Sequence, residues 1–377
     1  MTIPLSLYIH FPWCVKKCPY CDFNSHEAQG TIPEAEYINA LEKDLLRDIG
    51  SSARLSHQDR TIKSIFLGGG TPSLFSADSM SDLFMRLRKH LDFTDDIEIT
   101  LEANPGTIDY PKFAGYFDAG INRLSMGVQS FNNHHLQGLG RIHSSNEVLL
   151  AYDAAIRAGF RNINLDLMHG LSAQSIDQAM NDLSQAIELK PTHLSWYQLT
   201  IEPNTQFYKQ PPILPPEDDL WDIYTDGLKL LENNGFSRYE VSAFSQANKR
   251  AQHNLNYWHF GDYLGIGAGA HGKITERDGI ERTAKTRLPK DYLLEQKSKT
   301  TRIPANELVS EFLMNALRLT DGFSTSLFEQ RTDLPITALD SFLAKAEERA
   351  LITREINQIM PTNLGLQYLN EMLLLTD

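Results

Sequence analysis

Three cysteines with a spacing suited to metal chemistry lie close to the start of this chain. Cys14, Cys18 and Cys21 form a C-x3-C-x2-C run and are the only cysteines among 377 residues. Three soft thiolates suit an iron–sulfur cluster or a zinc ion. A structural zinc site takes four protein ligands, whereas a site with three keeps a coordination position open for chemistry. The run therefore predicts a reactive metal centre.

Zinc is the alternative metal for this run. His10 or His26 could complete a Cys3His site. Zinc sites usually combine two short ligand clusters separated by a dozen or more residues, but this chain has a single cluster. The odd cysteine count and the lack of a secretory signal argue against disulfides. We therefore favour an iron–sulfur cluster over zinc, and zinc over unligated thiols.

Composition and charge limit the classes of function. The chain is 41% hydrophobic and 22% charged, as expected of a globular protein of two or three domains. Its apolar runs fall short of the ~20 residues that a membrane span needs. The net charge of −13 gives no electrostatic reason to bind nucleic acid. Reduced thiols and the absence of a targeting segment predict a cytoplasmic protein.

Short apolar runs alternate with helix-like segments through the first two hundred residues. Helical periodicity is clear in Ala35–Ile49 and Ser79–Leu91. Alternating strands and helices predict an α/β fold with parallel strands and right-handed crossovers. Six units fit a partial (β/α)6 barrel better than a closed eight-stranded one. The expected strands are Leu5–Phe11, Ile62–Leu67, Ile97–Leu101, Asn122–Met126, Asn162–Leu167 and His193–Leu199.

The rest of the chain divides at changes in composition. We expect a core over residues 1–235, a core extension and linker over 236–300, and a mainly helical, winged-helix-like module over 301–377. Within the extension, Lys285–Arg302 is charged and is predicted to be a linker. Winged helices often bind DNA, but residues 301–377 hold 6 Lys+Arg against 11 Asp+Glu, a net charge of −5. We therefore expect a protein-contact or lid module.

Polar residues follow the expected strands where each one ends. In βα barrels the carboxyl ends of the strands meet at one mouth, where the chemistry takes place. Gly265, Gly267 and Gly269 loosely imitate a dinucleotide-binding fingerprint, but no helix follows them, so we expect them to allow close packing of strands. The polar residues at these strand ends are Gly68–Ser73, Glu102, Gln129 and Gln198, and Asp166 lies inside an apolar strand.

The cysteine spacing resembles that of the radical S-adenosylmethionine (SAM) superfamily. The resemblance implies a [4Fe-4S] cluster on the three cysteines, with its free iron binding SAM. From the residues alone, Glu102 could be a turn carboxylate, Gln129 a helix cap, Arg141 a surface base and Asp166 a structural partner. By resemblance, the SAM-contacting residues are Tyr8, Gly69, Gly70, Thr71, Glu102, Gln129, Arg141 and Asp166.

Longer motifs resemble the coproporphyrinogen-oxidase-like branch of that superfamily from end to end. They are Tyr-x-His-x-Pro-x-Cys, Gly-Gly-Gly-Thr-Pro-Ser, Arg-Leu-Ser-Met-Gly-Val-Gln-Ser-Phe and Asn-Leu-Asp-Leu-Met-His-Gly. The oxygen-independent coproporphyrinogen III dehydrogenase of this family carries a further cysteine two positions after the third. Phe23 occupies that position here, and 13 residues precede Cys14, fewer than in the dehydrogenase.

The motif H-N-x-x-Y-W, from His253 to Trp258, is instead typical of the heme chaperone branch. That resemblance implies heme as cargo near His253, Tyr257 and Trp258, and delivery to an acceptor hemoprotein such as a respiratory one. An aromatic packing cluster is the structural alternative, and the dehydrogenase is the alternative function. A homodimer and peripheral membrane contact stay open. Other histidines that could ligate the iron are His169, His259 and His271.

Overall fold

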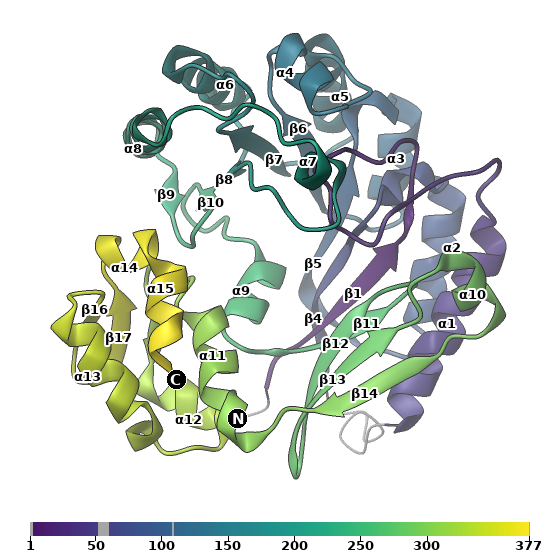
Figure 1. Cartoon of the computed structure of the whole chain (residues 1–377). Coiled ribbons are helices and arrows are strands. Elements are labelled where there is room, and N and C mark those ends of the chain that lie inside the picture. Colours follow the sequence, from purple (N-terminus) through teal and green to yellow (C-terminus); the bar gives the residue numbers. More distant parts are fainter. Residues whose placement is uncertain (1–2, 52–59, 108, 377) are drawn as a thin grey trace.

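One mixed sheet of twelve strands forms the centre of the protein, with helices along its outer side (Figure 1). The structure is a computed structural model that describes residues 3–51, 60–107 and 109–376. The strands in sheet order are β14 (Ser298–Arg302), β13 (Gly279–Lys285), β12 (His271–Glu276), β11 (Asp262–Ile266), β1 (Leu5–Phe11), β4 (Ile62–Gly69), β5 (Phe93–Ala103), β6 (Arg123–Gln129), β7 (Asn162–His169), β8 (His193–Gln198), β10 (Ala243–Ser245) and β9 (Ser237–Arg238).

The six expected strands are confirmed as β1, β4, β5, β6, β7 and β8, which pair in parallel in that order. Both faces of β1 are buried except at Tyr8, as expected for a parallel strand covered on both sides. The predicted partial barrel is therefore present. Connecting helices are α1 (Glu34–Ser51), α2 (Ala77–Leu87), α3 (Tyr110–Asp118), α4 (Asn133–Gly138), α5 (Ser145–Arg157), α6 (Ile176–Glu188), α7 (Gln206–Lys209) and α8 (Glu217–Asn233).

The sheet continues beyond β1 through residues late in the chain. Strand β11 pairs in parallel with β1, and β12, β13 and β14 follow as antiparallel strands. The prediction that Lys285–Arg302 is a linker is therefore wrong: this segment ends β13 and forms α10 (Pro289–Leu294) and β14. Its polar residues are compatible with an edge strand, because one edge of such a strand is unpaired and charged side chains there discourage pairing with another chain. A Cβ at Gly265 would overlap the carbonyl of His271, which confirms the role expected for this glycine.

Two buried ionic groups attach this extension to the core. Lys285 Nζ lies 2.7 Å from Asp44 and 2.5 Å from Asp48, both on α1. On the other side, Asp262 accepts from Arg60 at 2.9 Å and from Lys273 at 3.0 Å. Buried charges need such partners, because an unpaired one carries a large desolvation cost. The extension is thus held to the barrel by specific ion pairs.

The C-terminal module has a core of its own, beside the sheet extension (Figure 1). A three-stranded sheet in the order β15-β17-β16 packs with helices, in agreement with the mainly helical module that we expected. Phe260 of the extension also packs in that core, where its ring centroid lies 5.7 Å from that of Phe312. The module therefore contacts the extension directly. Its elements are α11 (Leu308–Ala316), β15 (Phe323–Ser324), α12 (Thr325–Thr332), α13 (Asp340–Glu348), β16 (Ile352–Arg354), β17 (Gln358–Pro361), α14 (Asn363–Gln367) and α15 (Leu369–Leu373).

No helix within the described ranges has both the length and the apolar character required to cross a bilayer.

Candidate functional site

The three cysteines lie on one loop at the mouth of the barrel. Strand β2 (Trp13–Cys14) pairs with β3 (His26–Glu27) and closes the base of this loop. The amide of Cys21 donates to the carbonyl of Cys18 at 3.1 Å, which turns the chain between them. All three thiols line a pocket of about 290 Å³. The short spacing in sequence therefore becomes a shared position in space.

The thiols share this pocket without converging on a single point. In the described part of the chain, no three His, Cys, Asp or Glu side chains are grouped closely enough to hold one metal ion. A [4Fe-4S] cluster takes one thiolate on each of three irons, and the three cysteines that line this pocket could supply them. Burial raises the pKa of the Cys14 and Cys21 thiols, and bound iron would reverse that effect by favouring the thiolate.

The glycine run at the end of β4 brings backbone against the cysteine loop. Gly69 has φ +108°, which favours glycine, and a Cβ there would overlap the His10 imidazole. The amide of Gly70 donates to the Phe11 carbonyl at 2.7 Å, and that of Thr71 donates to the Trp13 carbonyl at 2.7 Å. These bonds fix the glycine run against the residues that precede Cys14.

Two carboxyl groups face the same pocket, Glu102 from the end of β5 and Asp166 from within β7. Glu102 accepts from the amide of Gly69 at 3.0 Å, and Asp166 accepts from Ser125 at 2.9 Å and from Asn164 at 2.8 Å. Burial, and then the nearby Asp166, raises the pKa of Glu102 to about 8. Burial also raises the pKa of Asp166, although its hydrogen bonds oppose the shift. A cationic ligand beside this pair would stabilise both ionised forms.

Gln129 and Arg141 also line the pocket. Gln129 has φ 71°, an unusual backbone conformation for this residue type, and its side chain accepts from the Tyr197 hydroxyl at 2.8 Å. Arg141 donates to the Gly127 carbonyl at 2.7 Å and lies 3.6 Å from the Cys18 sulfur. Its Nε is buried and has no partner among the described residues. An unpaired donor on a buried guanidinium is suited to an anionic ligand group.

The structure brings together nearly all of the residues predicted to bind the cluster and SAM. The exception is Tyr8, whose hydroxyl oxygen lies 2.8 Å from His10 Nδ1 and which lines a second cavity, described below. Sequence reasoning missed Tyr197, although the alternation along β8 could have suggested that it faces away from the buried Trp196. The predicted residues in the pocket are Cys14, Cys18, Cys21, Gly69, Gly70, Thr71, Glu102, Gln129, Arg141 and Asp166.

A second, larger cavity of about 1170 Å³ adjoins this pocket. Phe23, Gly69 and Glu102 line both, so the two spaces are neighbours. Aromatic side chains form much of the cavity wall, and the ring centroids of Tyr257 and Tyr263 lie 4.7 Å apart. Tyr257 and Trp258 are the last two residues of α9 (Gln252–Trp258), and this helix lies inside the curve of the sheet (Figure 1). The cavity is suited to a large, flat, apolar ligand.

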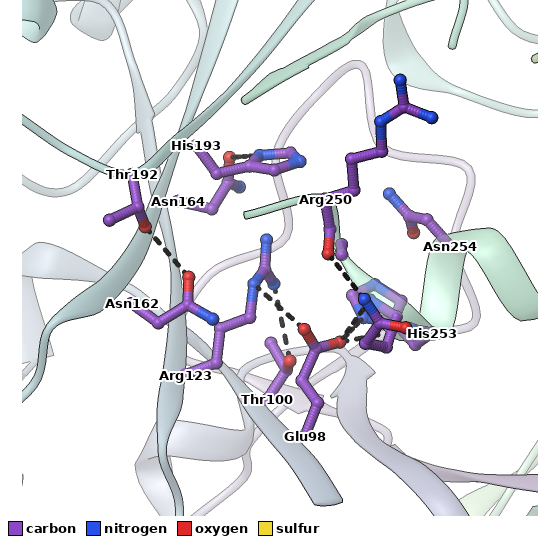
Figure 2. A network of polar contacts seen from close by, with 12 residues as sticks. Glu98, Thr100, Arg123, Asn162, Asn164, Thr192, His193, Arg250, His253 and Asn254 are labelled. Atoms are coloured by element: carbon purple, nitrogen blue, oxygen red, sulfur yellow. Dashed lines mark hydrogen bonds and ion pairs between the residues drawn. The ribbon is translucent and has the colours of Figure 1, made fainter. Parts of the chain in front are cut away.

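His253, the first residue of the same motif, lies in a buried polar network (Figure 2). Its Nδ1 is 3.1 Å from Glu98, its backbone amide donates to the same carboxylate, and its ring lies 4.2 Å from that of Phe66. Burial alone would raise the pKa of Glu98, but His253 and Arg123 hold it at about 2. His253 is not among the residues that line the large cavity.

The other candidate histidines lie in different places. His169 stacks on Trp196 with ring centroids 4.2 Å apart, and His259 lines a separate pocket beside the C-terminal module. His271, on β12, lines the large cavity together with Tyr257 and Trp258. Of the four histidines considered, His271 is therefore the one that shares the cavity with the aromatic pair.

Comparisons with known proteins agree with this geometry. The profile of the Radical SAM superfamily matches residues 8–183, and that of the HemN C-terminal domain matches residues 303–368. The solved structure of coproporphyrinogen III oxidase (HemN) from Escherichia coli superposes with a TM-score of 0.81 over 100% of this chain and 90% of that one. At 24% identity, this match shows the fold alone. The parallel strands, the thiol loop and these matches define a radical SAM protein.

Full-length relatives identify the particular family. A heme chaperone HemW from Haemophilus influenzae is 50% identical over 376 residues, covering 98% of this chain and 97% of that protein. HemW proteins from Escherichia coli and Bacillus subtilis are 47% and 35% identical, with 97% or more of each chain covered. The chain belongs to the heme chaperone HemW family.

Proposed function

We propose that this protein binds heme in the large cavity and passes it to a hemoprotein, with a [4Fe-4S] cluster and SAM in the adjoining pocket. The observation that carries this proposal is the shared wall of the two spaces at Phe23, Gly69 and Glu102. A ligand in one cavity would contact residues that also face the other. The name of the relatives, heme chaperone, supports heme as the cargo.

In the smaller pocket, Cys14, Cys18 and Cys21 would hold the cluster. When bound, a reduced cluster supplies the electron that cleaves the sulfonium bond of SAM. Arg141 would pair with the SAM carboxylate through its unpartnered donor. Glu102, protonated at neutral pH because its pKa is about 8, would release its proton when a cationic ligand group lies beside it.

In the larger cavity, Tyr257 and Trp258 would pack against the macrocycle. We predict that an imidazole is the axial ligand of the heme iron. His253 and His271 are the two candidates for this ligand. Glu98 holds His253 at Nδ1 and leaves Nε2 for a metal, but His253 does not line the cavity, so its ring would have to move to reach the iron, whereas His271 already lines the cavity. Burial and the cations Arg282 and Arg287 lower the pKa of His271, which keeps the imidazole in the neutral form that ligates iron.

We also propose where the protein acts and which class of protein receives the heme. We place the protein in the cytoplasm, with a hemoprotein such as a respiratory one as the acceptor. A homodimer and peripheral contact with a membrane stay predictions.

The second candidate function is coproporphyrinogen III dehydrogenation. The aromatic cavity beside the radical SAM pocket would also fit a porphyrinogen. Phe23, however, occupies the position where the dehydrogenase has a further cysteine, and its side chain is 60% exposed at the border of the two spaces. The phenylalanine at this position therefore favours the chaperone function over the dehydrogenase function.

The test is a heme titration of the anaerobically reconstituted protein, followed through the Soret band. We expect a saturable shift near one heme per chain that weakens in His271→Ala, with His134→Ala as a control on an exposed histidine. Weakening in His253→Ala alone would assign the ligand to His253. If heme does not saturate the protein and coproporphyrinogen III is converted, the chaperone proposal is wrong.

A further inference from the structure

The wall of the large cavity is basic, although the chain as a whole carries a net charge of −13. Most of the basic residues in this wall lie in the sheet extension, on β12, β13 and β14 or in the segment between β13 and β14. Glu102 is the one acidic residue in the described lining, and with a pKa of about 8 it is mostly neutral at physiological pH. The basic lining residues are Lys273, Arg282, Lys285, Arg287, Lys297 and Lys299.

Some of these cations already have acidic partners. Lys273 pairs with Asp262, and Lys285 pairs with Asp44 and Asp48. Arg282 pairs with Glu311, and Lys297 lies 3.0 Å from Glu295. These charges are therefore largely neutralised within the protein.

Arg287 and Lys299 differ from the others. Across the described ranges, no Asp or Glu side chain forms an ion pair with either of them, and both are exposed. The Arg287 backbone is nevertheless held in place, because its carbonyl accepts from Asn24 at 2.8 Å. Two free cations at one cavity are consistent with a site for anionic groups of a ligand.

The strand register places Lys299 in line with His271. His271 pairs with Ala284 across β12 and β13, and Ala284 pairs with Lys299 across β13 and β14. Directly paired residues share a face, and neighbouring strands are about 4.8 Å apart, so His271 and Lys299 are separated by about 10 Å along that face. This separation is of the same order as that between the centre of a porphyrin and its carboxylates.

Unsatisfied donors give an independent sign of a polar ligand group. Trp258 Nε1 and Arg282 Nε are buried and lack a hydrogen-bond partner in the described ranges, and both residues line this cavity. A buried donor without a partner is destabilising, and an acceptor on a ligand would satisfy it. The cavity therefore combines flat aromatic walls with free donors and free positive charge.

We propose that Arg287 and Lys299 form a carboxylate clamp that pairs with the two propionate groups of a planar tetrapyrrole. The proposal rests on the proposed function and extends it to a ligand class: a dianionic porphyrin, held by aromatic walls and oriented by its acidic edge. Because both cations are exposed, their ion pairs with the ligand would be weakened by salt.

The experiment compares two probes, iron protoporphyrin IX and its dimethyl ester, which lacks the two negative charges. The variant Arg287→Gln/Lys299→Gln is titrated beside wild type and beside Lys89→Gln/Arg354→Gln, which removes two exposed cations outside the cavity. We expect the clamp variant to bind iron protoporphyrin IX about ten-fold more weakly than wild type, while its affinity for the ester stays within about two-fold. Added salt should weaken binding of the acid to wild type more than to the clamp variant.

The outcomes separate the two proposals. Saturable binding of iron protoporphyrin IX that is equal in wild type and the clamp variant would overturn the clamp and leave the heme carrier standing. An equal loss for acid and ester would also overturn the clamp, because it would show a general disturbance of the cavity. If wild type binds neither probe saturably, the proposed function itself fails.

Discussion

Replacing Glu102 by Gln should change how the stability of the SAM-free protein depends on pH. The native pKa is about 8 against an ordinary value of 4.5, so between these pH values the native state keeps a proton that the unfolded state has lost. The free energy of unfolding must then fall as pH rises, by about 1.4 kcal/mol per pH unit. Gln does not ionise, so Glu102→Gln removes this fall. The stability of the variant relative to wild type should rise by about 3 kcal/mol between about pH 5 and pH 7.

The assay is urea unfolding at several pH values, with Glu348→Gln as a control on an exposed carboxylate. Subtracting the unfolding free energy of wild type from that of each variant cancels the contribution of every titratable group that the substitution leaves unchanged. A difference between Glu102→Gln and wild type that does not vary with pH would refute the reasoning, because it would mean that Glu102 is ionised in the native pocket. SAM binding by the variant should be weaker, since a carboxylate is lost.

Three further substitutions test other parts of the structure. Gly69→Ala should destabilise the protein by about 2 kcal/mol or more in urea unfolding and reduce cluster absorption, whereas Gly30→Ala, with positive φ but open space, should cost less. Asp262→Asn should lower the unfolding free energy by about 3–5 kcal/mol, because it removes the partner of two buried cations; an unchanged Tm would contradict this. Glu98→Gln should weaken heme binding, measured by the Soret titration, by loosening His253 and α9, and equal heme affinity would show that this contact does not position the motif.

The parallel core and the cysteine pocket could be predicted because their signals are local. Each strand of the core is a short apolar run, and the three thiols lie on one loop. The carboxyl-end rule then correctly grouped Glu102 and Asp166, which are 64 positions apart in the sequence but share one pocket.

Features that depend on distant partners could not be predicted. His253 and Glu98 are separated by 155 residues, so nothing near the H-N-x-x-Y-W motif indicates that its histidine is held by a buried carboxylate. Strand β14 was predicted as a linker because its sequence, Ser-Lys-Thr-Thr-Arg, is polar, and only its pairing with β13 makes it a strand. The free cations of the cavity lie in that same misassigned segment.

The pairing of β1 with β11 also affects how the chain folds during synthesis. Leu5 pairs with Asp262, so one edge of the first strand has no partner until more than 250 later residues have been made. Until then an apolar strand edge next to the cysteine loop is exposed, a state prone to aggregation and to wrong pairing. Contacts of such high sequence separation also slow folding. In the ribosome-bound chain the edge of β1 next to the cysteine loop therefore stays unpaired until late in translation, when β11 pairs with it and completes this part of the core.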